Sequence, residues 1–217
     1  KRAQEDAEVK LGIESNLIMC FLRDMSAESA MEHLEMSLPF KDHIIGVGLD
    51  SDEKNNPPEK FAEVFAHARA EGYKLTMHCD VNQEDILGHI RECLDLINVD
   101  RIDHGVNCLE DDGLVQEIVS RELGLTICPV SNRFVVQSLT SAEIKKMLDH
   151  GIKATINSDD PAYFRAYLND NFIALAEEGK FTKEDIVQLS RNAFDIAWLP
   201  DSRRQNYIDL LNEFNSN

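Results

Sequence analysis

The sequence predicts an α/β fold in which short parallel strands alternate with helices. Apolar segments typical of strands begin about every 28 residues along the chain. They are Asn16–Phe21, Ile44–Leu49, Lys74–His78, Arg101–His104, Leu125–Cys128 and Lys153–Asn157. Strict alternation of strands and helices requires parallel strands that are joined by right-handed crossovers. A repeat of this length is compatible both with an open, doubly wound sheet and with a closed (β/α)8 barrel.

The segments between the strands carry the apolar spacing of helices that bury one face. In Glu59–Glu71, the residues Phe61, Val64, Phe65 and Ala68 recur at i, i+3, i+4 and i+7. Similar stripes predict further helices over Ile86–Ile97, Asp112–Arg121 and Ser141–His150. At the two ends of the chain, Lys1–Leu11 is expected to be helical, and Phe181–Asn217 is expected to form two helices around Pro200.

Composition and charge narrow the class of protein. The chain has 217 residues and a formal net charge of -18, and so acidic a surface repels phosphate backbones. We therefore expect a small-molecule partner and no nucleic acid. No apolar run reaches the roughly 20 residues that cross a membrane, and Lys1–Lys10 lacks the apolar stretch of a signal peptide. These features predict a cytoplasmic protein with no membrane partner.

The cysteines point to the same compartment. Five is an odd number, and no two of them form a C-x-x-C pair. This pattern is typical of free, buried thiols in a reducing cytosol. The five are Cys20, Cys79, Cys93, Cys108 and Cys128.

Polar residues follow the strands where each strand ends. Neither a G-x-G-x-x-G nor a P-loop motif follows any strand, which argues against a nucleotide-phosphate loop. In a (β/α)8 barrel the chemistry lies at the carboxyl ends of the strands. The residues at those positions are Asp50-Ser51-Asp52-Glu53, His78, His104, Ser131-Asn132 and Ser158-Asp159-Asp160.

Three of these strand ends offer side chains that bind zinc. A single histidine after a strand is more often structural, and S-D-D-P alone is typical of a helix start, because aspartate caps helices and Pro161 suits the first turn. His78, His104 and Asp159 together, at the same end of successive parallel strands, predict a shared site. Imidazole and carboxylate are zinc ligands, and zinc in a catalytic site activates water.

Several of these motifs resemble one known family. Arg101–Gly105 reads RIDHG, Cys128–Asn132 reads CPVSN and Ile156–Pro161 reads INSDDP. Together with GVGLDSDE and PPEKF, these segments are similar to motifs of the adenosine deaminase family. The resemblance implies a zinc-dependent (β/α)8-barrel enzyme in which a metal-activated hydroxide attacks C6 of a 6-aminopurine and ammonia leaves. It leaves open adenosine, adenine or an N6-substituted adenine as substrate. The alternatives are another metal-dependent barrel hydrolase and a catalytically impaired binding homologue.

The same resemblance implies a role for each matching residue. His78 and Asp159 would be zinc ligands, and Asp159 would also polarise the attacking water. His104 would orient the hydroxide. Asp160 would accept a hydrogen bond from the purine ring. Ser51 stands where the family usually has a glycine whose backbone N–H meets that ring.

The chain departs from the family pattern in two places. No H-x-H occurs anywhere, although the family takes its remaining zinc ligands from such a motif in the first strand. This absence and the count of about six βα units instead of eight predict that residues 1–217 form one barrel domain, preceded by two further βα units. The family's H-A-G-E is replaced by His78-Cys79-Asp80-Val81, so the position of its glutamate holds Val81. Either Asp80 or Glu84 is expected to transfer the ring proton; the alternatives are a proton from another group or an enzyme that is slow or inactive on adenosine. The sequence does not indicate the oligomeric state.

Three neighbouring features have competing interpretations. Cys79 is expected to be a packed thiol, because strand alternation points it away from the side of His78. Asp52-Glu53-Lys54 is either a solvated loop or a loop that contacts substrate. Tyr163, Phe164 and Tyr167 are expected to pack a helix rather than to form a stacking platform for a base.

Overall fold

The computed structural model describes residues 1–79 and 85–216, within which six strands alternate with helices. These residues form two compact units. The first unit consists of Lys1–His78 and Arg91–Asp100, and the second consists of Cys79–Ile90 and Arg101–Asn217. Each unit contains three parallel strands. The predicted alternation of strands and helices is confirmed in both units.

The first unit contains a sheet in the order β1-β2-β3. The strands are β1 (Leu17–Leu22), β2 (Ile44–Asp50) and β3 (Lys74–Cys79), and they pair in parallel. The helical elements are α1 (Arg2–Leu11), α2 (Ala27–Ser37), α3 (Ala62–Ala70), two 3-10 segments at Leu38–His43 and Pro58–Phe61, and a π-helical turn at Cys93–Ile97.

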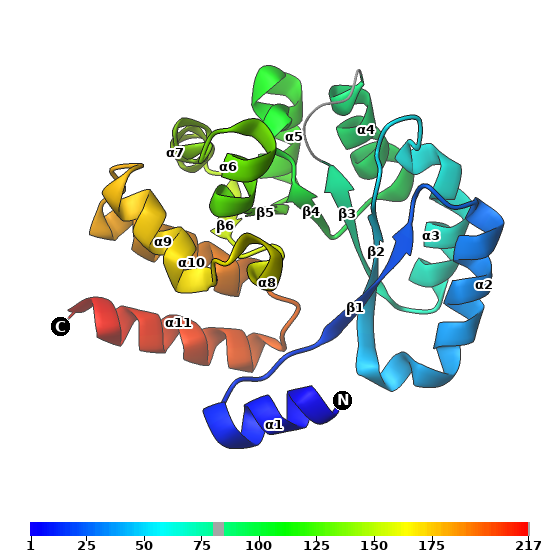
Figure 1. Cartoon of the computed structure of the whole chain (residues 1–217), viewed down its shortest axis with the longest axis horizontal. Helices are drawn as coiled ribbons and strands as arrows, with labels where there is room; N and C mark the ends of the chain where they lie inside the picture. The colour runs from blue at the N-terminus through cyan, green and yellow to red at the C-terminus, as the bar shows by residue number, and fades with distance from the viewer. Residues whose placement is uncertain (80–84, 217) are drawn as a thin grey trace. The chain divides into compact units, whose positions relative to one another are not determined.

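The core of the first unit lies between its helices and its strands. Helices α2 and α3 contact each other, and α2 also contacts β1 (Figure 1). The predicted stripe of Phe61, Val64, Phe65 and Ala68 is buried throughout, with no side chain more than 1% exposed. The rings of Phe65 and of Phe21 from β1 pack edge to face, with their centroids 5.8 Å apart. Burial of this apolar face holds the helix against the sheet.

The second unit contains a sheet in the order β4-β5-β6. The strands are β4 (Arg101–His104), β5 (Gly124–Ile127) and β6 (Lys153–Ile156), again parallel. A 3-10 segment spans Val106–Glu110, and the helices are α5 (Asp112–Ser120), α6 (Pro129–Val136), α7 (Ser141–Asp149), α8 (Pro161–Phe164), α9 (Leu168–Glu177), α10 (Lys183–Ile196) and α11 (Asp201–Ser216). Helix α4 (Ile86–Glu92) begins in the second unit and ends in the first.

The element boundaries differ from the predicted ones by small amounts that have local causes. The helix predicted over Ile86–Ile97 is α-helical only to Glu92 and then widens into the π-helical turn. The strand predicted to end at Cys128 ends at Ile127, because Pro129 opens a helix and Cys128 becomes its N-cap. The two predicted C-terminal helices are confirmed as α10 and α11.

The prediction of five buried thiols is wrong at one position. Cys79, Cys93, Cys108 and Cys128 are buried, whereas Cys20 in β1 is exposed. Burial raises the pKa of the Cys108 thiol to about 12, which keeps that sulfur protonated and unreactive near neutral pH.

A buried amide joins α10 to β6, two elements of the second unit that contact each other. Asn192 is 4% exposed, and its Nδ2 donates to the carbonyl oxygen of Ala154 at 2.8 Å. We expect Asn192→Ala to lower the free energy of unfolding by about 1–3 kcal/mol, because a buried strand carbonyl loses its side-chain partner. Urea unfolding checks this, with Gln205→Ala on the exposed face of α11 as control. Equal midpoints for the two variants would contradict it.

Candidate active site

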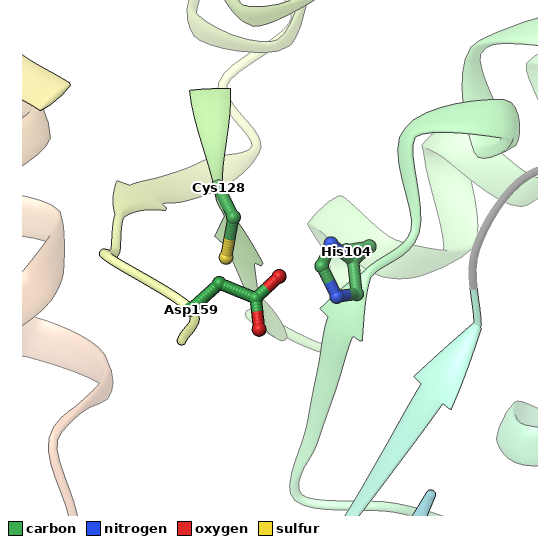
Figure 2. A group of neighbouring side chains, drawn as sticks. All are labelled: His104, Cys128 and Asp159. Carbon is green, nitrogen blue, oxygen red and sulfur yellow. The ribbon is translucent and has the colours of Figure 1, made fainter. Parts of the chain in front are cut away.

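Three side chains that can bind a metal ion meet in the second unit. They are His104, Cys128 and Asp159, and their ligand atoms all lie within 4.8 Å of one another. Figure 2 shows the carboxylate of Asp159 facing both the sulfur of Cys128 and the ring of His104. His104 is the last residue of β4, Cys128 directly follows β5 and Asp159 follows β6. The carboxyl ends of three neighbouring strands therefore supply the cluster, as the sequence predicts for His104 and Asp159.

The backbone at this cluster is held in an uncommon conformation. His104 and Asp159 have φ values of 64° and 56°, in the left-handed region that residues other than glycine seldom adopt. Gly105 follows at φ 71°, and a Cβ there would lie 2.8 Å from Leu125 Cδ2. Such conformations cost about 1–3 kcal/mol each and are concentrated at functional sites.

The cluster combines buried groups with an exposed one. His104 is 4% exposed and Cys128 is 5% exposed, whereas Asp159 is an exposed residue. A buried imidazole keeps a fixed position, and an exposed carboxylate can be reached by water or by a ligand. Imidazole nitrogen, thiolate sulfur and carboxylate oxygen are all zinc donors, so the chemistry of this set fits a divalent metal such as zinc.

Cys128 was missed as a member of the cluster. The sequence indicates only a buried thiol, which the structure confirms. Its position at the start of CPVSN, directly after β5, was the available signal, because His104 and Asp159 also follow strands. Cysteine so often fills apolar space that burial alone does not distinguish this thiol from Cys93 or Cys108.

His78 belongs to the first unit, where it is held by a buried carboxylate. It is the penultimate residue of β3, and its Nδ1 lies 2.6 Å from Glu53 Oε1. The side chain of His78 is 30% exposed and that of Glu53 is 9% exposed. Cys79, the next residue along β3, is fully buried, so the prediction of a packed thiol is confirmed. A site shared by His78 with the cluster of the second unit stays a prediction.

Ser51 and Asp160 each lie in a turn that follows a strand. Ser51 has φ 83°, which explains why glycine suits this position, and its backbone N–H donates to Asp50 Oδ1 at 2.8 Å. A purine that bound this N–H would share or replace that hydrogen bond. Asp160 is the exposed N-cap of α8. The predicted proton donors Asp80 and Glu84 lie outside the described residues.

The aromatic residues after Asp160 do not all pack as predicted. Phe164 packs against a small core cluster that includes Val130 and Ala166. Tyr163 and Tyr167 are 82% and 67% exposed, so the prediction of helix packing is wrong for both. Helix α8 has only four residues, which is too short to bury more than one face.

Comparison with known proteins identifies the family to which this chain belongs. The sequence model of the adenosine deaminase family matches residues 1–214, and the chain belongs to this family. Among curated relatives, an uncharacterized deaminase of Schizosaccharomyces pombe is 48% identical over 99% of this chain and 64% of its own length. An adenine deaminase of Psychrobacter cryohalolentis is 46% identical over 98% of this chain and 64% of its own length. The chain thus spans just under two thirds of the length of these relatives.

A solved structure is similar to this chain in fold as well as in sequence. The crystal structure of an adenine deaminase from Arthrobacter aurescens matches with a TM-score of 0.92 and 35% sequence identity, over 100% of this chain and 66% of its own. This likeness confirms the predicted (β/α)8-barrel fold class, to which the chain contributes six βα units. In the part of the chain that the structure describes, no helix is both long and apolar enough to span a membrane.

Proposed function

We propose that the protein containing this chain is a zinc-dependent hydrolase that removes the 6-amino group of adenine. The observation that carries the proposal is the meeting of His104 and Asp159 at the carboxyl ends of parallel strands, in a chain of the adenosine deaminase family. Similarity to relatives that are named as adenine deaminases favours the free base over adenosine. The overall reaction adds the oxygen of water at C6 and releases ammonia, which gives hypoxanthine.

The zinc ion would be held by His78 and Asp159. Zinc, when bound, lowers the pKa of water towards neutrality and makes that water a nucleophile. Imidazole nitrogen and carboxylate oxygen match its preferred donors, and the carboxylate of Asp159 is exposed and therefore reachable. Asp159 also accepts a hydrogen bond from the attacking water and so aims its lone pair at C6.

His104 would orient the attacking water and move its proton. The imidazole is buried and its carboxylate neighbour is Asp159, so the two groups can act on one water molecule. Asp160 accepts a hydrogen bond from an N–H of the purine ring, and the backbone N–H of Ser51 donates to a ring nitrogen. Asp80 or Glu84 supplies the proton that the ring takes up as water adds.

A comparison of three substrates tests the proposal. Loss of the 6-aminopurine absorbance is followed for the zinc-loaded, full-length protein with adenine, adenosine and N6-methyladenine. We expect the highest kcat/KM for adenine. Preferred turnover of adenosine or N6-methyladenine would overturn the assignment of the substrate. No turnover of any of the three by the zinc-loaded protein would overturn the deaminase itself and favour another metal-dependent hydrolase.

A further inference from the structure

Glu53 is a buried carboxylate in a loop whose neighbours are exposed. Asp52 and Lys54 on either side of it are exposed, whereas Glu53 is 9% exposed. Burying an ionised carboxylate costs several kcal/mol unless it is paired and hydrogen-bonded. Glu53 therefore does not share the exposure that a solvated loop would give it and that Asp52 and Lys54 have, whereas a contact of this loop with substrate stays a prediction.

The first partner of Glu53 is the imidazole of His78. The Oε1 of Glu53 lies 2.6 Å from His78 Nδ1, although the two residues are 25 positions apart in the sequence. An ionised carboxylate can only accept, so Nδ1 carries the hydrogen and donates it. The metal-binding lone pair of the neutral ring is then on Nε2, at the other side of the imidazole.

The second partner is Arg23, which directly follows β1 and is fully buried. Its Nη1 lies 3.6 Å from Glu53 Oε1 and donates to the carbonyl oxygen of His78 at 2.7 Å. Its Nε donates to the carbonyl oxygen of Asn56 at 2.9 Å, in the loop that carries Glu53. One guanidinium thus compensates the charge of the carboxylate and fixes both the loop and the backbone of the histidine.

Lys60 holds the Arg23 backbone and the loop that carries Glu53 through two further hydrogen bonds. Its Nζ donates to the carbonyl oxygen of Arg23 at 2.9 Å and to Asn56 Oδ1 at 2.8 Å. The side chains that orient His78 therefore come from the segments after β1, after β2 and at the start of the next helical segment. A ring held from several elements keeps one orientation, as a metal ligand must.

We propose that Glu53 is the positioning residue of His78: it fixes the Nδ1–H tautomer and the ring orientation that direct Nε2 at the metal. Arg23 pairs with Glu53 and keeps its carboxylate in place. This inference rests on the proposed function, because it takes His78 as a zinc ligand. Carboxylates that accept the second ring N–H of a ligating histidine typically contribute 10- to 100-fold to metal affinity or activity.

The test is zinc affinity, measured by competition with a chromophoric chelator on the full-length protein. We expect Glu53→Ala to weaken zinc binding near the upper end of the 10- to 100-fold range. We expect Glu53→Gln to weaken it near the lower end, because the amide oxygen of glutamine still accepts a hydrogen bond from His78 Nδ1–H. The visible spectrum of the cobalt-loaded protein should differ from that of the parent protein in Glu53→Ala. The spectrum of Glu53→Gln should lie closer to that of the parent protein. The matched control is Glu71→Gln, which removes the partly exposed carboxylate that pairs with Lys41. It should bind zinc as the parent protein does.

His78→Ala separates this inference from the proposed function. If His78→Ala binds zinc as tightly as the parent protein, the assignment of His78 as a ligand is wrong. If His78→Ala loses zinc while both Glu53 variants keep the parent affinity and cobalt spectrum, the positioning role is wrong and the proposed function stands. If Glu53→Ala does not fold, Glu53→Gln decides the question. An unchanged affinity in that variant overturns the inference.

Discussion

Replacing His104 with alanine is expected to lower kcat/KM for adenine by about 10²- to 10⁴-fold, the range that a positioned acid–base group contributes. The reason is the position of His104 at the end of β4, buried at 4% exposure beside the carboxylate of Asp159. Without the imidazole, no group at this position orients the attacking water or moves its proton. Zinc content should stay at the parent level, because His104 is not one of the proposed ligands.

The matched control for this variant is His150→Ala. His150 is exposed at the C-terminal end of α7, where an imidazole has no role in the proposed reaction. Steady-state kinetics on both variants, with zinc measured on the same samples, checks the prediction. Parent-level kcat/KM in His104→Ala would contradict the proposed role. Loss of zinc in that variant would instead make His104 a ligand.

Replacing Asp159 with asparagine is expected to abolish both zinc binding and turnover. The substitution keeps the size of the side chain but removes the negative charge and replaces one carboxylate oxygen with an amide nitrogen that cannot ligate. Loss of a direct ligand should cost more than the roughly 10- to 100-fold that loss of an outer partner costs. Asp149→Asn, at the exposed end of α7, serves as the matched control.

Elemental analysis and kinetics on the two aspartate variants decide the outcome. We expect zinc and activity to disappear together in Asp159→Asn and to remain in Asp149→Asn. Retained zinc with lost activity would limit Asp159 to a role in catalysis. Retained activity would remove Asp159 from the site altogether.

Local patterns predict the alternation of strands and helices and the meeting of His104 and Asp159. The apolar stripe of Phe61, Val64, Phe65 and Ala68 marks a buried helix face, and the structure buries all four side chains. The repeat of strands places His104 and Asp159 at one edge of a parallel sheet, and the two residues meet there. Both inferences depend on geometry that repeats within a few residues, which is the information that sequence periodicity carries.

Long-range pairing accounts for most of what the sequence did not indicate. Glu53 contacts His78 across 25 residues, and Arg23 reaches the carbonyl of His78 across 55. No periodic pattern links residues so far apart, and a charged triplet such as Asp52-Glu53-Lys54 is usually solvated. Cys128 was missed for a related reason, because its neighbours in the cluster, His104 and Asp159, are also far from it in the sequence.

The most direct measurement is the product analysis of adenine incubated with the zinc-loaded, full-length protein in ¹⁸O-labelled water. Hydrolytic deamination predicts one hypoxanthine with ¹⁸O at C6 for each ammonia released, and both products should form about 10²- to 10⁴-fold more slowly in His104→Ala. Unchanged adenine, or an unlabelled product, would contradict the proposal that the protein containing this chain is a hydrolytic deaminase of the 6-amino group.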